Sequence, residues 1–176
     1  GSSVSLSEEE QKEAEGKEFD VLKYDGMRAF KTGETAFAIE CFRHALRLQE
    51  DLEVRDYLSQ ALIQSNELLK AYDELQKLAD AEPDNIQIVI RMAHVAYMME
   101  NYTVMGDACE RGKLLDKDNV DINYLYARAC LGMGDLVNTI AMLTKTISLD
   151  EDCVSAYQLR GETLLKMGDV EGADAD

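Results

Sequence analysis

Apolar side chains recur at helical spacing in short segments along the whole chain, and short polar stretches separate these segments. The first segment contains Phe19, Leu22 and Phe30, at intervals that place side chains on one face of a helix. A second amphipathic segment begins after Thr32–Gly33, and the alternation then continues with a period of 33 or 34 residues. This pattern predicts pairs of amphipathic helices, each pair joined by a tight turn and repeated along the chain.

Three series of positions share this period. The first consists of small residues, the second lies twelve residues later, and the third occupies the expected turn between the two helices. Small side chains allow two helix axes to approach closely, so we expect the first two series at helix crossings. Glycine accepts the left-handed backbone that reverses a chain after a helix. The series are Gly26, Ser59, Ala93, Ala127 and Gly161; Ala38, Ala71, Met105, Thr139 and Ala173; and Gly33, Asn66, Glu100, Gly134 and Gly168.

The period divides the chain into an acidic segment over residues 1–18, which we expect to be helical or partly disordered, and an array over residues 19–176. Ser7 and Glu10 fit a capping box, so a helix is expected to begin before the first repeat, although Gly16 weakens it. In the last, incomplete unit we expect a turn at Met167–Gly168–Asp169. The predicted units span about 19–51, 52–85, 86–119, 120–153 and 154–176.

The 34-residue pattern resembles that of the tetratricopeptide-repeat family over residues 19–176. The chain departs from the family pattern at Met105 and Thr139, where alanine is expected, and it keeps the terminal proline only as Pro83. The resemblance implies an all-α, right-handed superhelix of antiparallel helix pairs, which binds peptides or partner helices along an inner wall lined by the first helices. The matching residues are Gly26, Gly33, Ala38, Phe42 and Ala45; Ala93, Tyr97 and Asn101–Tyr102; and Tyr157, Gly161, Gly168–Asp169 and Ala173.

Basic and aromatic residues gather on the expected inner wall of the third and fourth units. Arginine and tyrosine often anchor protein interfaces, and arginine binds a carboxylate through two parallel hydrogen bonds. We therefore hypothesise that this patch, together with Lys23 on the first unit, binds an acidic or C-terminal carboxylate group of a peptide. The alternative is that these residues pair with Asp121 and nearby acids. The patch residues are Arg91, His94, Tyr97, Tyr124 and Arg128.

The composition and charge of the chain limit the classes of partner that we expect. The chain has 35 acidic and 18 basic residues, for a net charge of −17, so it repels phosphate backbones and a nucleic-acid partner is not expected. No apolar run approaches the roughly 20 residues that cross a bilayer. The N-terminus lacks a basic and then apolar signal sequence, and the four cysteines lack metal-binding spacing. We therefore expect a cytoplasmic location, with a removed signal peptide left open because the chain begins at Gly1.

No motif for catalysis, phosphate binding or a cofactor appears, and His44 and His94 are too far apart to share a metal. We therefore expect a non-enzymatic scaffold that binds a peptide or partner helix, with neither cofactor nor metal. Two alternatives remain at this point. In the first alternative, the chain is an assembly factor that self-associates through the apolar face of the last unit, formed by Val154, Leu159, Leu164 and Leu165. In the second alternative, the chain is a regulatory segment of a larger protein.

Overall fold

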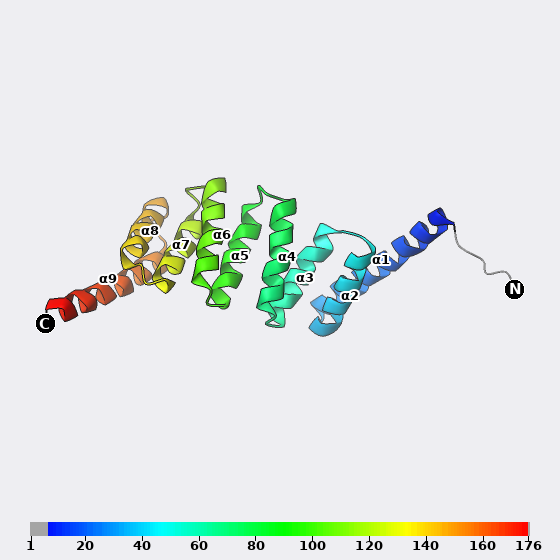
Figure 1. Ribbon diagram of the computed structural model, residues 1–176, viewed down its shortest axis with the longest axis horizontal. Helices are drawn as coiled ribbons and strands as arrows, with labels where there is room; N and C mark the ends of the chain where they lie inside the picture. The colour runs from blue at the N-terminus through cyan, green and yellow to red at the C-terminus, as the bar shows by residue number, and fades with distance from the viewer. Residues whose placement is uncertain (1–6, 176) are drawn as a thin grey trace. The chain divides into compact units, whose positions relative to one another are not determined.

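The structure, a computed structural model, describes residues 7–175, and this range contains nine α-helices and no strand (Figure 1). Successive helices are joined by short turns, so the prediction of an all-α fold built from helix pairs is confirmed. The helices are α1 (Glu8–Lys31), α2 (Thr35–Leu48), α3 (Leu52–Gln64), α4 (Leu68–Ala81), α5 (Ile86–Met98), α6 (Tyr102–Leu115), α7 (Val120–Gly132), α8 (Leu136–Leu149) and α9 (Val154–Ala175).

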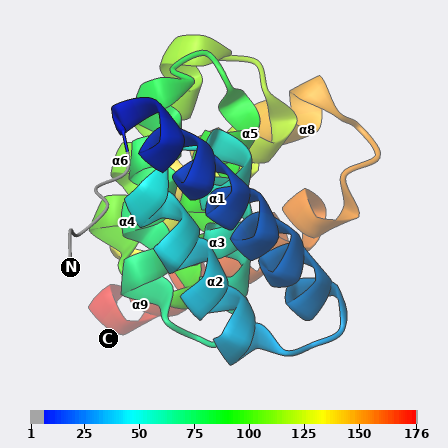
Figure 2. The ribbon, with the colours of Figure 1, turned by 90° about the vertical axis from the view of Figure 1, so that its right-hand side faces the viewer.

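The chain forms two compact units, Gly1–Leu78 and Ala79–Asp176, and the boundary falls within α4. In the first unit, α1, α2 and α3 pack around a core that includes Phe42, Leu58 and Leu62, each at most 1% exposed. Figure 2 shows α1, α2 and α3 of this unit from the side. In the second unit, α7, α8 and α9 bury a cluster that includes Leu143 and Leu159.

Helix α1 begins at the predicted capping site. The Ser7 hydroxyl accepts a hydrogen bond from the backbone N–H of Glu10 at 3.2 Å, which satisfies one of the unpaired donors of the first turn. The helix then continues through Gly16 to Lys31 without a break. Residues 8–18 of the predicted acidic segment are therefore helical and continuous with the first helix of the array, and residues 1–6 lie outside the described residues.

The small residues of the first series lie at close helix crossings in the first four pairs. A Cβ atom added to the buried Gly26 would lie only 2.5 Å from Cε1 of Phe42 in α2, so no larger residue fits without movement of the ring. Ser59, Ala93 and Ala127 are fully buried at the equivalent positions. The second series is equally buried, since Ala38, Ala71, Met105 and Thr139 each have 0% exposure. Ala173 lies among the residues whose side chains are not described.

The predicted turn series adopts the left-handed backbone in the same four pairs. Gly33 and Gly134 have φ values of +84° and +79°, and Asn66 and Glu100 have φ values of 59° and 56°. After each of these residues, the next N–H donates to a carbonyl five residues earlier, as Asp135 N–H does to the Cys130 oxygen at 2.9 Å. These bonds satisfy the last carbonyls of the first helix and direct the chain into the second helix.

The fifth unit contradicts two predictions. Residues Met167–Gly168–Asp169 are helical within α9, so the expected turn does not form. With no second helix beside it, Gly161 is exposed, and an added Cβ would find nothing within 4 Å. Gly161 is therefore not at a helix crossing, although it shares the period.

Two alanine substitutions at equivalent positions should have opposite effects on stability. Gly26→Ala should lower the free energy of unfolding by about 1–3 kcal/mol, because the new methyl group overlaps the Phe42 ring. Gly161→Ala should raise it by about 0.5–1 kcal/mol, because alanine favours the helix and meets no neighbour. Urea unfolding followed by circular dichroism measures both changes. Equal changes in the two variants would contradict the crossing assigned to Gly26.

Candidate functional site

In the second unit, the guanidinium group of Arg128 lies between two tyrosine side chains. Its Nε donates a hydrogen bond to the hydroxyl of Tyr124 at 3.1 Å, and its Nη1 donates to the hydroxyl of Tyr97 at 3.1 Å. The guanidinium carbon also lies 5.3 Å from the ring centroid of Tyr97 and 5.5 Å from that of Tyr124, within the range of cation–π attraction. The arginine is thus held in one orientation by two neutral partners.

The helices explain how these three residues meet. Tyr124 and Arg128 are four residues apart in α7, so they lie one turn apart on the same face. Helix α5, which contacts α7 directly, contributes Tyr97 near its C-terminal end. The Tyr97 ring packs against Tyr102, at the start of α6, with ring centroids 6.4 Å apart. Tyr102 in turn fills the space beside Gly132, where an added Cβ would collide with its ring.

Arg128 keeps much of its hydrogen-bonding capacity. A guanidinium group has five N–H donors, and the two tyrosine hydroxyls use two of them. Among the residues that the structure describes, no carboxylate forms an ion pair with Arg128. Because each tyrosine oxygen accepts a bond from Arg128, its own O–H proton remains able to donate to a further group. The arrangement therefore offers several donors to an incoming anion.

Arg55 of the first unit contrasts with Arg128, because its side-chain donors are bound by carboxylates of the same unit. Its Nε and Nη2 donate to the two carboxylate oxygens of Glu50 at 2.9 and 2.6 Å, and its Nη1 donates to Glu74 of α4. The hydrogen bonds that Arg55 donates to Glu50 are the main reason that the pKa of Arg55 rises above its usual value, and the same bonds lower the pKa of Glu50. Arg55 joins α3 to α4, whereas Arg128 forms no ion pair with an acid in the part of the chain that the structure describes.

The other predicted site residues have different surroundings. Arg91 is half-buried and His94 is exposed on α5. His94 precedes Tyr97 by three residues and shares its helix face, whereas Arg91 precedes Tyr97 by six residues and lies roughly 120° away around the helix. Lys23 belongs to the first unit, where its Nζ lies 3.3 Å from Asp51 Oδ2 and 3.2 Å from Glu53 Oε1. The structure thus brings Tyr97, Tyr124 and Arg128 together, while Lys23 pairs with acids of its own unit.

Sequence reasoning missed the support given by Tyr102 and Gly132. The repeat pattern accounts for Tyr102 only as the residue that follows Asn101. Two features of the sequence are relevant to this contact. Gly132 is the last residue of α7, and the aromatic residue Tyr102 directly follows the turn that ends at Asn101. Only the contact between the two residues shows that the glycine makes room for the ring that positions Tyr97.

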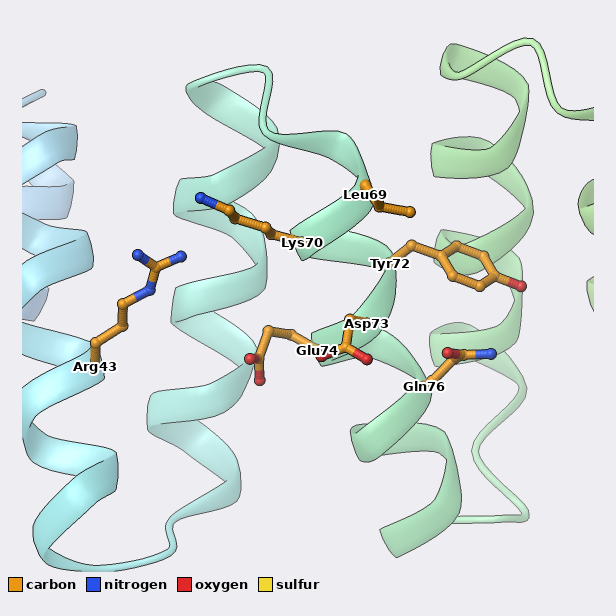
Figure 3. A pocket seen from close by; sticks show the side chains of 7 residues that line it. All are labelled: Arg43, Leu69, Lys70, Tyr72, Asp73, Glu74 and Gln76. Atoms are coloured by element: carbon orange, nitrogen blue, oxygen red, sulfur yellow. The ribbon is translucent and has the colours of Figure 1, made fainter.

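A hollow lies in the first unit, between α2 and α4, with a volume of about 500 Å³. Figure 3 shows Arg43 reaching from α2 towards α4, while Lys70 and Glu74 reach back towards it. The carboxylate of Glu74 already binds Arg55, and the other charged residues that line the hollow are of both signs. This mixture does not define one ligand class, so we regard the Arg128 site as the stronger candidate.

Three of the four cysteine thiols are buried, namely those of Cys41, Cys109 and Cys130. Burial raises the pKa of Cys109 to about 12, and it also raises the pKa values of Cys41 and Cys130. These thiols therefore stay protonated near neutral pH, whereas a nucleophile or metal ligand must be a thiolate. Within the described part of the chain, no group of His, Cys, Asp and Glu side chains is arranged to hold a metal, and no helix is long and apolar enough to cross a membrane.

Thiol labelling should distinguish these cysteines. Only Cys153 is half-exposed, so the native protein should react rapidly with Ellman's reagent at one thiol at pH 8. In guanidinium chloride all four thiols should react. A Cys153→Ser variant should lose the rapid phase and nothing else. Rapid native labelling of Cys109 would contradict the burial that raises its pKa.

Comparison with solved structures identifies the fold. A crystal structure of MamA protein superposes with a TM-score of 0.76 at 19% identity, covering 87% of this chain and 84% of that chain. MamA 41-end from Desulfovibrio magneticus RS-1 gives a TM-score of 0.74 at 18% identity, covering 90% of each chain. YrrB, described as a TPR protein with an unusual peptide-binding site, gives 0.68 at 15% identity, covering 77% of this chain and 71% of that chain.

No protein-family model and no curated protein matches the sequence. Identities this low establish a shared architecture and not a shared partner. The architecture agrees with the four helix pairs and the ninth helix of the described residues, and with the 33- or 34-residue period of the sequence. The chain has the fold of a tetratricopeptide-repeat solenoid, as its sequence predicts.

Proposed function

We propose that this protein is a non-enzymatic interaction scaffold, and that Arg128 binds a carboxylate group of a partner peptide. One observation carries the proposal: Arg128 is held rigidly by Tyr97 and Tyr124 and, among the described residues, has no acidic partner. Holding an arginine in place before binding reduces the side-chain entropy lost when a ligand is bound. The fold supports the general role, because stacked helix pairs offer extended binding surfaces.

The remaining donors favour a carboxylate. The Nε edge is occupied by Tyr124, so the ligand approaches the end of the guanidinium, where Nη1 and Nη2 retain N–H groups. Two parallel bonds from this end match the two oxygens of a carboxylate. The hydroxyls of Tyr97 and Tyr124 lie beside the same group and add donors. His94 is exposed on the same face of α5 as Tyr97 and extends the polar surface along that helix.

The net charge of −17 opposes an acidic ligand at long range. At physiological ionic strength, however, interactions between exposed charges are screened beyond about 8 Å. The short charge-assisted bonds from Arg128 therefore decide binding, and the global repulsion mainly slows association. The same net charge supports the proposal that nucleic acid is not a partner. The four unpaired cysteines support a reducing compartment such as the cytoplasm.

A second candidate function is self-association through α9. The observation in its favour is that Val154, Leu164 and Leu165 are 65%, 52% and 72% exposed. Leu159, which was expected on this face, is instead 4% exposed and packs in the core with Leu143. Light scattering decides between the two functions, since a mass that is constant with concentration excludes self-association and a rising mass favours it.

Removing the Arg128 charge should abolish most peptide binding. Arg128→Gln should weaken binding of a fluorescein-labelled acidic decapeptide with a free C-terminus by at least about tenfold, because charge-assisted bonds contribute roughly 1.5–3 kcal/mol. Tyr97→Phe, which keeps the ring and removes one hydroxyl, should have a smaller effect in the same direction. Fluorescence anisotropy measures the affinity, and circular dichroism confirms unchanged helicity.

Arg160→Gln is the matched control, because Arg160 also stacks on a tyrosine, with 5.5 Å to the Tyr157 centroid, but lies on α9 and not on α7. It should bind the peptide like the unmodified protein. Amidating the peptide C-terminus shows which carboxylate is bound. If the affinity falls, Arg128 binds the terminal carboxylate, and if the affinity is unchanged, Arg128 binds an acidic side chain. Undiminished binding by Arg128→Gln would refute the proposal.

A further inference from the structure

Three successive contacts connect Arg128 to a glycine one turn further along the same helix. Arg128 Nη1 donates to the Tyr97 hydroxyl at 3.1 Å, and the Tyr97 ring lies edge-on to the Tyr102 ring, with 6.4 Å between the centroids. A Cβ added to Gly132 would collide with Cγ, Cδ1 and Cδ2 of Tyr102, so this ring lies directly on the glycine. Because Arg128 and Gly132 both belong to α7, the contacts begin and end on one helix and pass through α5 and α6.

The equivalent contact in the first unit is polar. Thr35 occupies the position of Tyr102 in the period. Gln64 occupies that of Gly132. The Thr35 hydroxyl donates a hydrogen bond to Gln64 Oε1 at 3.3 Å. The packing of successive helix pairs in this protein therefore does not require an aromatic ring over a glycine at this place.

The residue equivalent to Tyr97 is also supported differently in the first unit. This residue is Phe30, and its ring packs on that of Tyr57 with 5.7 Å between the centroids. In the second unit the position of Tyr57 is occupied by Leu125, which has no ring. The aromatic support of Tyr97 comes from Tyr102 in α6, whereas that of Phe30 comes from α3.

The backbone at Gly132 does not call for a glycine. Gly132 is the last residue of helix α7, and the left-handed residue of the following turn is Gly134, with φ of +79°. Glycine destabilises a helix relative to alanine, because it loses more backbone freedom on folding. At Gly132 the obstacle to a side chain is the Tyr102 ring. The contact also lies at the edge of the packed interior, since Gly132 is exposed and Tyr102 is half-buried.

We propose that Tyr102 and Gly132 are positioning residues of the Arg128 site, and that they set its affinity for a carboxylate by fixing the Tyr97 ring. This inference rests on the proposed function of Arg128. The edge-on contact with Tyr102 favours one orientation of the Tyr97 ring. In that orientation the Tyr97 hydroxyl accepts from Arg128 Nη1 and limits rotation of the guanidinium group. Motion that is restricted before binding reduces the entropy lost when a ligand binds.

Gly132→Ala tests this inference in the full chain. The added methyl group should displace the Tyr102 ring and weaken binding of the fluorescein-labelled acidic decapeptide about three- to tenfold, measured by fluorescence anisotropy. Tyr102→Ala, which removes the ring, should weaken binding to a similar degree, whereas Tyr102→Phe keeps the ring and should bind normally. In the Tyr102→Ala protein, Gly132→Ala should cause no further loss, because the ring that it displaces is already absent.

Gly106→Ala is the matched control. It makes the same substitution in the same pair of helices, but its new Cβ would lie at an ordinary contact distance, 3.6 Å from Cε of Met133. It should leave the affinity for the peptide unchanged. Circular dichroism should show the same helicity in all variants, because the contact between Tyr102 and Gly132 lies at the edge of the packed interior.

Nuclear magnetic resonance of ¹⁵N-labelled arginine side chains measures the positioning without a ligand. In the unmodified protein the hydrogen bond to Tyr97 should slow rotation of the Arg128 Nη1 group about its bond to Cζ. Gly132→Ala and Tyr102→Ala should both accelerate this rotation, and Tyr102→Phe should leave it slow.

The outcomes distinguish this inference from the proposed function. If the peptide does not bind the unmodified protein, the proposed function fails and the inference fails with it. If the peptide binds through Arg128 but Gly132→Ala and Tyr102→Ala bind it with unchanged affinity, only the positioning role is overturned. Unchanged rotation of the Arg128 Nη1 group in both variants would overturn the positioning role as well.

Discussion

The helix pairs of this protein depend on one close crossing in each pair. At Gly26 the crossing is so tight that the Phe42 ring occupies the place of a side chain, and Ser59, Ala93 and Ala127 keep the equivalent positions fully buried. A close approach lets the second helix bury its own apolar face, and that burial supplies most of the stability of a short helix. The left-handed turns follow from the same constraint, because only a tight reversal returns the chain to the crossing. Where no second helix covers the crossing residue, at Gly161, the turn at Gly168 is also absent.

The same packing determines which charged groups remain available to a partner. Arg55 is tied to Glu50 and Glu74 and joins two helices of the first unit, so its donors are satisfied within the protein. Arg128 is held by two tyrosine hydroxyls instead, and no carboxylate of the described residues forms an ion pair with it. In a chain with a net charge of −17, an arginine without an acid beside it is unexpected on electrostatic grounds. The binding role that we propose for Arg128 would account for tyrosines rather than carboxylates around it.

Much of the fold was predictable from the sequence, because the repeated crossings and turns are local and each is marked by residue type. Four of the five turn positions, Gly33, Asn66, Glu100 and Gly134, adopt the expected backbone. The fifth position, Gly168, lies inside helix α9, so the expected turn does not form there. In the site, the period placed Tyr97, Tyr124 and Arg128 on related helix faces. It did not predict their hydrogen bonds, the pairing of Lys23 with Asp51 and Glu53, or the packing of Tyr102 on Gly132, since these depend on side-chain conformation in three dimensions.

The central claim is that Arg128 is a positioned and available donor to a carboxylate. Nuclear magnetic resonance of ¹⁵N-labelled arginine side chains tests it most directly, with the Arg128 signals assigned by their loss in Arg128→Gln. On titration with an acidic peptide that has a free C-terminus, the guanidinium signals of Arg128 should shift in proportion to saturation, while those of Arg55 stay unchanged. Saturable binding that leaves the Arg128 signals in place would contradict the account.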